Sequence, residues 1–241
     1  MSHFAGKTYW LIGASEGLGR EIAIALDQHG ATLVLSARSQ QRLQDLASGL
    51  SNARVVPMDV TDPRSVQAAA QGLGPIDGVI YNAGAYDPMP TQDWDSDKAL
   101  RMMEVNINGA LRVFGHVVPE FVAQKRGDIT LIGSLAGYHG LPAAVGYGAS
   151  KAALISLAET MRHDLRSSGV IVRLINPGFI KTRLTEKNSF AMPQLMSPQK
   201  AADVVVKALR STRFRTDFPR PFSWVIKALT ILPDWLLYRF K

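Results

Sequence analysis

The amino-acid sequence predicts an α/β fold in which a doubly wound parallel sheet lies between two layers of helices. Strand-length apolar runs recur along the chain, and the segments between them carry apolar residues at helical spacing. Such alternation produces parallel strands with both faces covered by helices. Because no linker or change of composition divides residues 1 to about 210, we expect a single domain over residues 1–218 with a C-terminal helical appendage over 219–241.

Strands and helices are expected to alternate from the N-terminus onward. The helix after the first strand should begin near Leu18, and Asp62 with Pro63 suits the N-cap and first position of a later helix. Ser197 and Pro198 suit the same two positions near the end of the domain. The expected strands cover residues 8–13, 32–36, 54–58, 76–81, 128–133 and 170–175.

The composition excludes several functional classes. The 241 residues are 46% hydrophobic and 20% charged, as in ordinary globular proteins. Without cysteine the chain forms no disulfide and no thiolate metal site, and the five histidines show no ligand spacing, so no metal is expected. The N-terminus does not have the pattern of a signal peptide, so the expected location is the cytoplasm.

Positive charge is concentrated near the C-terminus. Residues 207–241 contain eight Lys and Arg against Asp217 and Asp234, which accounts for six of the seven net positive charges. Because the rest of the chain is nearly neutral, a basic surface for nucleic acid is not expected. Any attraction to anionic partners is expected in the C-terminal segment.

A glycine-rich turn follows the first expected strand. The sequence GASEGLG places Gly13, Ser15, Gly17 and Gly19 around the start of the helix at Leu18. Glycines permit a tight turn and let a pyrophosphate approach the N–H groups at the positive end of a helix. Alone, this spacing is equally compatible with a tight connection. In a Rossmann-type sheet the turn is the expected site of a dinucleotide.

The end of the second strand favours NADP(H) over NAD(H) as the cofactor. Ala37 occupies the position that is usually acidic in proteins that hold an unphosphorylated ribose, and Arg38 follows it. An arginine at this position can pair with the 2′-phosphate of NADP(H). The alternative is a solvated arginine, and Glu16 is an unfavourable charge near that phosphate. NAD(H) is therefore kept as the second choice.

Two further strand ends are expected beside the cofactor. Asp59, followed by Val60, ends the third strand, and the fourth ends in Asn82, Ala83 and Gly84. Ligands of doubly wound sheets bind beyond the carboxyl ends of the strands, where such a turn lets the chain pass close to a ribose. The alternative is that the turn only ends the strand.

A tyrosine and a lysine form an expected reactive pair. Ser134 closes the fifth strand, and Tyr147 and Lys151 lie four residues apart on one helix face. Free tyrosine has a pKa near about 10, too high for efficient acid/base catalysis at neutral pH, and an adjacent ammonium group lowers it. Alone, this spacing is common among surface pairs. Its occurrence with Ser134, the Asn-Ala-Gly turn and the glycine loop predicts a catalytic site.

These residues together resemble the short-chain dehydrogenase/reductase family over residues 5 to about 210. The resemblance implies a catalytic triad of Ser134, Tyr147 and Lys151, in which Tyr147 is the acid/base and Lys151 also holds the nicotinamide ribose. It implies that Asn106, in EVNINGA, supports a water relay to the lysine. It also implies contacts to the nicotinamide carboxamide from the segment PGFIKT, through Pro177, Gly178, Ile180 and Thr182.

The resemblance further implies reduction of a ketone or aldehyde, or the reverse alcohol oxidation, by a homodimer or homotetramer. Residues 183–196 would cover the substrate site, and an apolar lining there would suit a hydrophobic small molecule. The alternative for this segment is a mobile surface loop. The usual last short strand of the family is expected to be missing. The apolar side chains of the segment are Phe190, Met192, Leu195 and Met196.

Residues 220–241 have two interpretations. Residues 223–232 are apolar around most of a helical turn, and Pro233 should end that helix, so the run is shorter than the about 20 residues of a membrane span. Packing on the core, on a partner subunit or over the substrate entrance is slightly favoured. The other interpretation is peripheral contact with a membrane surface. That contact would use Arg220, Trp224, Trp235, Tyr238, Arg239, Phe240 and Lys241.

Two other functions are alternatives to a reductase. A serine hydrolase needs G-x-S-x-G, whereas Ser134 lies in GSLAG without the intervening residue. A module that senses NADP(H), or docks at a membrane without turnover, would keep this fold and lose the chemistry. The complete set of Ser, Tyr and Lys argues against such a module.

Overall fold

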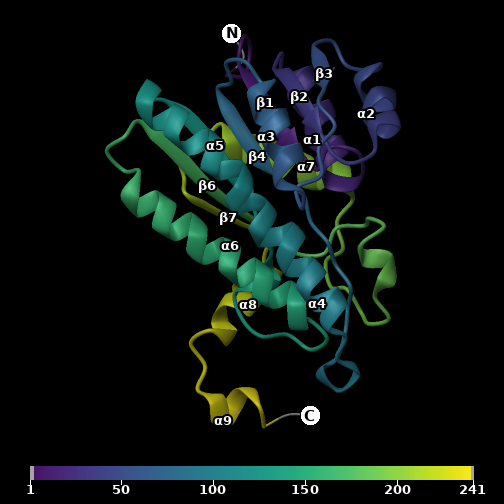
Figure 1. The fold of residues 1–241 in the computed structure, drawn as a ribbon. Coiled ribbons are helices and arrows are strands. Elements are labelled where there is room, and N and C mark those ends of the chain that lie inside the picture. Colours follow the sequence, from purple (N-terminus) through teal and green to yellow (C-terminus); the bar gives the residue numbers. More distant parts are fainter. Residues whose placement is uncertain (1–2, 240–241) are drawn as a thin grey trace.

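The computed structural model describes residues 3–239 and contains one seven-stranded parallel sheet between two layers of helices (Figure 1). This confirms the predicted α/β fold class. The strand order is β3-β2-β1-β4-β5-β6-β7, so the order reverses between β1 and β4. Doubly wound sheets bind their ligands in a crevice beyond the carboxyl ends of the strands at this point. The strands are β1 (Thr8–Ile12), β2 (Thr32–Ser36), β3 (Ala53–Val55), β4 (Gly78–Tyr81), β5 (Gly127–Ile132), β6 (Val170–Pro177) and β7 (Arg215–Phe218).

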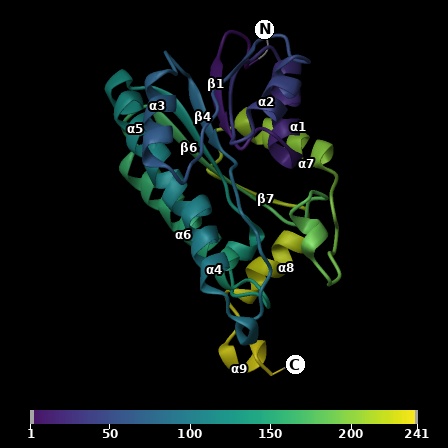
Figure 2. The same ribbon diagram turned by 45° about the vertical axis from the view of Figure 1, so that its right-hand side comes forward.

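The helices cover both faces of the sheet. Figure 2 shows α3, α5 and α6 on one face and α1, α2 and α7 on the other. The predicted N-caps are confirmed, because Asp62 accepts a hydrogen bond from the N–H of Arg64 and Ser197 accepts one from Lys200. The helices are α1 (Gly17–Gln28), α2 (Gln40–Ala47), α3 (Pro63–Gln71), α4 (Ser96–Met103), α5 (Gly109–Gln124), α6 (Val145–Asp164), α7 (Pro198–Leu209), α8 (Phe222–Leu229) and α9 (Asp234–Leu237).

The central strands are buried on both faces, as a parallel sheet requires. Along β1, Tyr9 and Leu11 join the core beneath α1 and α7, whereas Trp10 and Ile12 join the core beneath α5 and α6. Successive side chains of a strand point to opposite faces, so one short apolar run supplies both cores. This explains why the strands appear in the sequence as continuous apolar runs.

A buried ion pair lies between β5 and β6. Arg173 donates to Asp128 at 2.9 Å, and the hydroxyl of Tyr9 donates to the same carboxylate at 3.2 Å. Asp128→Ala is expected to lower the free energy of unfolding by about 3 to 5 kcal/mol, because it leaves a buried guanidinium without its partner. Chemical denaturation measures the loss. The matched control is Arg20→Ala, which breaks the exposed pair with Glu21 and should cost less than about 1 kcal/mol. Equal losses in the two variants would contradict this expectation.

The expectation that the last short strand is missing was wrong. β7 pairs in parallel with β6, with Phe218 buried beside Pro177. The charges of Arg215 and Asp217 conceal this strand in the sequence. In the fold each is neutralised, since Arg215 pairs with Glu159 and Asp217 with Lys227. An edge strand of mixed polarity therefore forms where an irregular tail was expected.

Two elements also end at other residues than the sequence predicted. β3 ends at Val55, so Asp59 lies in the following loop, where its carboxylate accepts hydrogen bonds from Thr61. The first C-terminal helix, α8, ends at Leu229 and not at Pro233. The Thr230 hydroxyl donates to the carbonyl oxygen of Lys227 and completes this turn. Pro233 then lies at the N-cap of α9.

The C-terminal tail contacts the body over a small part of its surface. In α8, Ser223 and Ile226 are buried and Phe222 is partly buried, whereas Trp224 and Trp235 are 58% and 67% exposed. Packing on the chain's own core therefore accounts for few of the tail's large side chains. Within residues 3–239, no helix has the length and apolar character needed to cross a bilayer. Phe240 and Lys241 lie outside the described residues.

Candidate active site

The predicted catalytic residues meet beside the crevice at the carboxyl ends of β4 and β5. Ser134 follows β5 and caps a short 3-10 turn, Leu135–Gly137, by accepting a hydrogen bond from the N–H of Ala136 at 3.1 Å. This bond holds Ser134, which is 7% exposed, in an extended conformation at the strand end. Tyr147 and Lys151 lie in the first turns of α6. This helix packs closely on the turn after Ser134, because a Cβ added to Gly137 would lie 2.7 Å from the carbonyl carbon of Lys151.

The hydroxyl groups of Tyr147 and Ser134 lie close enough for one to affect the pKa of the other. Burial raises the pKa of Tyr147, and the side-chain hydrogen bond with Ser134 lowers it in part. The sequence assigned the lowering of this pKa to Lys151. In the structure the pKa of Tyr147 is raised overall, and the group that lowers it is Ser134 and not Lys151. A hydroxyl pair of this kind can hold one oxygen atom and pass it a proton.

Lys151 is almost completely buried beside Tyr147. Its Nζ lies 5.7 Å from the centroid of the Tyr147 ring and donates to the carbonyl oxygen of Ile132 at 2.9 Å. Burial lowers the pKa of Lys151 to about 8. This lysine therefore carries its charge at neutral pH against a desolvation cost, unlike a solvated surface lysine.

Asn106 lies in a π-helical segment, Glu104–Asn108, between α4 and α5. Its side chain exchanges two hydrogen bonds with the backbone of Ala85 and donates to Ser150 at 2.8 Å. Ser150 in turn donates to the carbonyl oxygen of Tyr147 at 2.8 Å. A π-helical turn is rare and frequently marks a functional site. Asn106 thus ties the loop after β4 to the helix that carries the tyrosine and lysine.

The glycine loop packs directly against the end of β4. Gly13 has a φ of +85°, and an added Cβ would lie 2.7 Å from the backbone nitrogen of Ala83. At Gly19 an added Cβ would lie 2.0 Å from the carbonyl oxygen of Gly13, which also accepts a hydrogen bond from Asn82 at 2.9 Å. Both positions therefore require glycine for close approach of backbone to backbone. Gly84 continues this turn toward Asn106 and Lys151.

The start of α1 fits an anionic ligand. No side chain caps this helix, and Gly17, with a φ of +54°, turns the loop into it. The first N–H groups of a helix without a cap, beside the loop residue Ser15, are suited to a pyrophosphate. Leu18 is buried in the core below, so its side chain anchors the helix and only its backbone can serve the ligand. A dinucleotide of the predicted type therefore fits the residues that are present.

The segment after β6 reaches the same crevice. Gly178 donates to the carbonyl oxygen of Phe218 at 2.7 Å, which fixes the chain as it leaves Pro177. Ile180 is buried, and its carbonyl oxygen accepts a hydrogen bond from Thr185 at 2.7 Å. The methyl group of Thr182 lies 3.1 Å from where a Cβ on Gly17 would be, so this segment packs against the glycine loop.

The residues expected beside the adenosine lie apart from the catalytic group. Arg38 is exposed after β2, and Asp59 lies beyond β3, on the other half of the sheet. Val60 is buried in the core, and its carbonyl oxygen accepts a hydrogen bond from Arg112 at 3.2 Å. This separation suits an elongated ligand that runs across the switch point from β3 toward β5.

Glu16 is not the isolated unfavourable charge that the sequence suggested. Its carboxylate pairs with Arg42 at 2.8 Å and with Arg183 at 2.5 Å. Arg42 belongs to α2, and Arg183 begins segment 183–196. The glutamate thus connects the glycine loop to α2 and to segment 183–196, and its charge is balanced by two guanidinium groups.

Residues 183–196 are bonded to the loop after β4. The hydroxyl of Tyr86 donates to Asn188 at 2.6 Å, and Lys187 pairs with Asp87. The Tyr86 ring meets the Tyr147 ring edge-on with centroids 4.8 Å apart. Of the four apolar side chains expected as a lining, Met192 and Met196 are partly buried, whereas Phe190 and Leu195 are 44% and 42% exposed.

Several site residues had no clear signal in the sequence. Ser150 lies inside the expected helix at the third position after Tyr147, where a serine can bond back to a carbonyl group. Tyr86 is one aromatic residue in an irregular loop, and the partners of Glu16 are distant in sequence. Among the described residues, no group of His, Asp or Glu is arranged to hold a metal ion.

Comparison with known proteins gives matches over most of the chain. The family model described as short chain dehydrogenase matches residues 7–192. An uncharacterized oxidoreductase of Myxococcus xanthus is 33% identical over 245 residues, which cover 97% of this chain and 96% of that protein. A short-chain dehydrogenase from Sphingobium yanoikuyae, solved in complex with NADPH, is 25% identical with a TM-score of 0.84 and covers 92% of both chains. One from Burkholderia cenocepacia, in complex with NADP, is 25% identical with a TM-score of 0.83 and covers 97% of this chain and 100% of that one.

Proposed function

Because the chain belongs to the short-chain dehydrogenase/reductase family, whose members are oxidoreductases, we propose that it reduces a hydrophobic ketone or aldehyde with NADPH, or catalyses the reverse alcohol oxidation. The observation that carries this proposal is the junction of Ser134, Tyr147 and Lys151 with the glycine loop at one crevice. The nicotinamide would supply or accept the hydride. The chain's own residues would position the carbonyl and manage the proton.

Ser134 and Tyr147 would act on the substrate oxygen. The Ser134 oxygen already accepts a hydrogen bond from Ala136, so its hydroxyl proton is available for the carbonyl oxygen. The phenol of Tyr147 would give its proton to the same oxygen during reduction and take it back during oxidation. Because the Ser134 hydroxyl is close enough to the phenol to lower its pKa, a substrate oxygen placed beside both groups would meet two donors.

Lys151 and Asn106 would support that proton transfer. The Lys151 ammonium lies 5.7 Å from the centroid of the Tyr147 ring, from which its charge would favour a phenolate over a phenol, and it would also hold the nicotinamide ribose. Asn106 would fix the helix and the loop after β4 so that a water relay can reach the lysine. Gly13, Gly19 and the start of α1 would hold the pyrophosphate, and Pro177, Gly178, Ile180 and Thr182 the nicotinamide end.

NADP(H) is the proposed cofactor, with NAD(H) second. Arg38 is exposed where the 2′-phosphate of the adenosine ribose would lie, and Glu16 is held by Arg42 and Arg183. Its charge is therefore balanced and opposes a phosphate less than the sequence suggested. Two similar solved structures contain NADPH and NADP. A phosphate paired with an arginine gains from charge-assisted hydrogen bonds.

The proposed assembly and location follow the family and the composition. We expect a homodimer or homotetramer in the cytoplasm. The substrate is proposed to be apolar because segment 183–196, which is bonded to Tyr86 through Asn188, carries the partly buried Met192. Residues 220–241 are the part of the chain proposed to contact a membrane.

The direct test follows the absorbance of NADPH and NADH with a panel of carbonyl compounds. The panel runs from small polar aldehydes to long-chain and ring-fused ketones. We expect turnover with apolar members and faster turnover with NADPH than with NADH. NADPH binding without turnover of any panel member would instead favour a cofactor-sensing module on the same fold.

Lys151→Met is expected to raise the free energy of unfolding at pH 7 by about 2 to 3 kcal/mol. The folded pKa of about 8 lies below the ordinary 10.5, so the folded protein loses this proton before the unfolded chain does. The cost of the buried charge is therefore fully present below about pH 8 and disappears as pH rises toward 10.5. Chemical denaturation of both proteins from pH 7 to 10 should show the difference shrinking. A difference that is constant with pH would contradict the assigned cause, and exposed Lys200→Met is the control.

A further inference from the structure

The C-terminal tail exposes an unusual run of large apolar side chains. On α8, Trp224 and Val225 are 58% and 56% exposed, and beyond it Ile231, Trp235 and Tyr238 are more exposed still. Both ribbon views place α9 farther from the sheet than any other helix (Figures 1 and 2). Single exposed apolar residues are ordinary, but a group of them within one short segment indicates an interaction surface.

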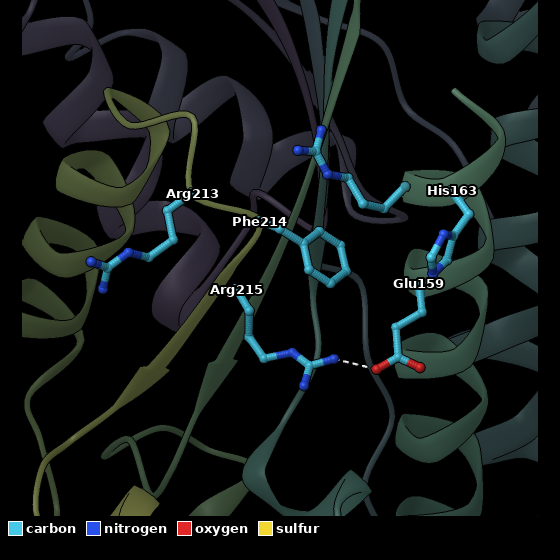
Figure 3. Close-up of a pocket in the computed structure, with 6 residues that line it drawn as sticks. Glu159, His163, Arg213, Phe214 and Arg215 are labelled. Atoms are coloured by element: carbon cyan, nitrogen blue, oxygen red, sulfur yellow. Dashed lines mark hydrogen bonds and ion pairs between the residues drawn. The ribbon is translucent and has the colours of Figure 1, made fainter. Parts of the chain in front are cut away.

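Arginine side chains gather next to this tail. A hollow of about 160 Å³ between β7 and α8 is lined by Arg213, Arg220 and Lys227 together with Trp224. A second hollow of about 520 Å³, between α6 and β7, shares Arg213 and Arg215 with the first. Figure 3 shows Arg215, Glu159 and His163 beside Phe214 in the second hollow, with the Arg213 side chain pointing away from the ring. The second hollow is lined by Glu159, Arg162, His163, Arg213, Phe214 and Arg215. Together the two hollows form one basic strip along the edge strand β7.

The acidic residues of the strip are already engaged. Glu159 pairs with Arg215, and Asp217 pairs with Lys227 while accepting a hydrogen bond from Tyr138 at 2.7 Å. Within residues 3–239, the exposed side chains of Arg162, Arg213 and Arg220 have no ion-pair partner. The strip therefore carries positive charge that no neighbouring carboxylate neutralises.

Aromatic residues and free cations occur together on this face. The Arg220 guanidinium lies 5.5 Å from the centroid of the Trp224 ring, so one arginine adjoins the first exposed tryptophan. An anionic bilayer offers phosphates for the cations and an interfacial layer for tryptophan and tyrosine. Nucleic acid would leave the aliphatic side chains of Val225 and Ile231 without an apolar partner. The short helices α8 and α9 suit a position on a membrane surface.

We infer that the basic strip and the apolar tail form one membrane-docking face, in which Arg213 and Arg220 bind the phosphates of anionic lipids and Trp224 and Trp235 lie at headgroup level. This inference specifies the membrane contact proposed for residues 220–241 and names a headgroup site outside that segment. It does not depend on the proposed reductase activity.

Sedimentation of the full-length protein with phosphatidylcholine vesicles, with and without phosphatidylglycerol, tests the inference. Wild type should bind only vesicles that contain the anionic lipid, and less at high salt, because salt screens the arginines. Arg213→Ala with Arg220→Ala should weaken partitioning by about 30-fold, from about 1 kcal/mol for each cation. The matched control removes two exposed cations from α3 and α7, Arg64→Ala with Lys200→Ala, and should bind like wild type.

Trp224→Ala with Trp235→Ala should weaken binding at low and high salt, and thermal melting by circular dichroism verifies that each variant is folded. Equal loss in the control double variant would overturn the assignment to Arg213 and Arg220. Absence of wild-type binding, or equal binding to neutral vesicles, would also overturn it. If the wild-type protein bound glycerol phosphate saturably and did not bind vesicles, the strip would be a site for a soluble anion. If the tryptophan variant changed its oligomeric state and the wild type did not bind vesicles, the tail would be a subunit contact. Either result would contradict membrane docking, and NADPH turnover can succeed or fail independently.

Discussion

Tyr147→Phe is expected to lower kcat for carbonyl reduction by about 10² to 10⁴, while NADPH binding stays close to that of wild type. The phenylalanine ring would keep the edge-on contact with Tyr86 and the position above Lys151. Only the hydroxyl beside Ser134 would be lost. Steady-state rates with the preferred substrate measure kcat, and the fluorescence of bound NADPH measures cofactor affinity.

The matched control for this variant is Tyr238→Phe. Tyr238 is 72% exposed in the tail, and its loss of a hydroxyl should leave kcat unchanged. If Tyr147→Phe kept wild-type activity, another group would have to supply the proton and the assignment of the acid/base would be wrong. Loss of both activity and NADPH binding would show a structural role for this hydroxyl in place of a chemical one.

Gly19→Ala is expected to abolish NADPH binding at concentrations that saturate wild type and to lower the thermal midpoint. Its Cβ would lie 2.0 Å from the Gly13 carbonyl oxygen and 2.6 Å from Nδ2 of Asn82, so the loop and the end of β4 would have to separate. The hydrogen bond of 2.9 Å between these two groups would then be disturbed. NADPH fluorescence and differential scanning calorimetry measure the two effects.

Gly115→Ala provides the opposite case within the same protein. Gly115 lies in α5 with no atom within 4 Å of an added Cβ, so alanine should fit without strain. Since alanine is the better helix former, this variant should gain about 0.5 to 1 kcal/mol of stability and bind NADPH normally. Normal NADPH binding by Gly19→Ala would contradict the described geometry of the glycine loop.

The fold could be predicted because each buried strand is a separate apolar run. The strands β1, β2, β4, β5 and β6 pass through the middle of the sheet, and their apolar side chains serve both cores. β7 lies at the edge and carries Arg215 and Asp217, so its pattern is that of an irregular segment until Glu159 and Lys227 are placed beside it. Pairing between distant residues supplies information that a local pattern lacks.

In the candidate site, too, local motifs could be predicted from the sequence and contacts between distant residues could not. Ser134, Tyr147, Lys151 and the glycines are local motifs at strand ends, and the structure places them at one crevice. The two partners of Glu16, at positions 42 and 183, come from separate elements, so its charge appeared unfavourable in the sequence. The exposure of the apolar side chains in the tail could not be predicted from the sequence either, because apolar residues at helical spacing suit a buried face and a membrane-facing surface equally.

Transfer of deuterium from NADPH to a carbonyl carbon tests the central claim most directly. The wild-type protein would be incubated with NADPH that carries deuterium at C4 of the nicotinamide, and with each member of the carbonyl panel. Mass spectrometry would then locate the label in any alcohol that forms. The expected result is an apolar alcohol that carries deuterium on its carbinol carbon. The deuterium would come from one of the two prochiral positions at C4 of the nicotinamide ring. Bound, unconsumed NADPH and no labelled alcohol across the panel would contradict the assignment of this chain as a carbonyl reductase.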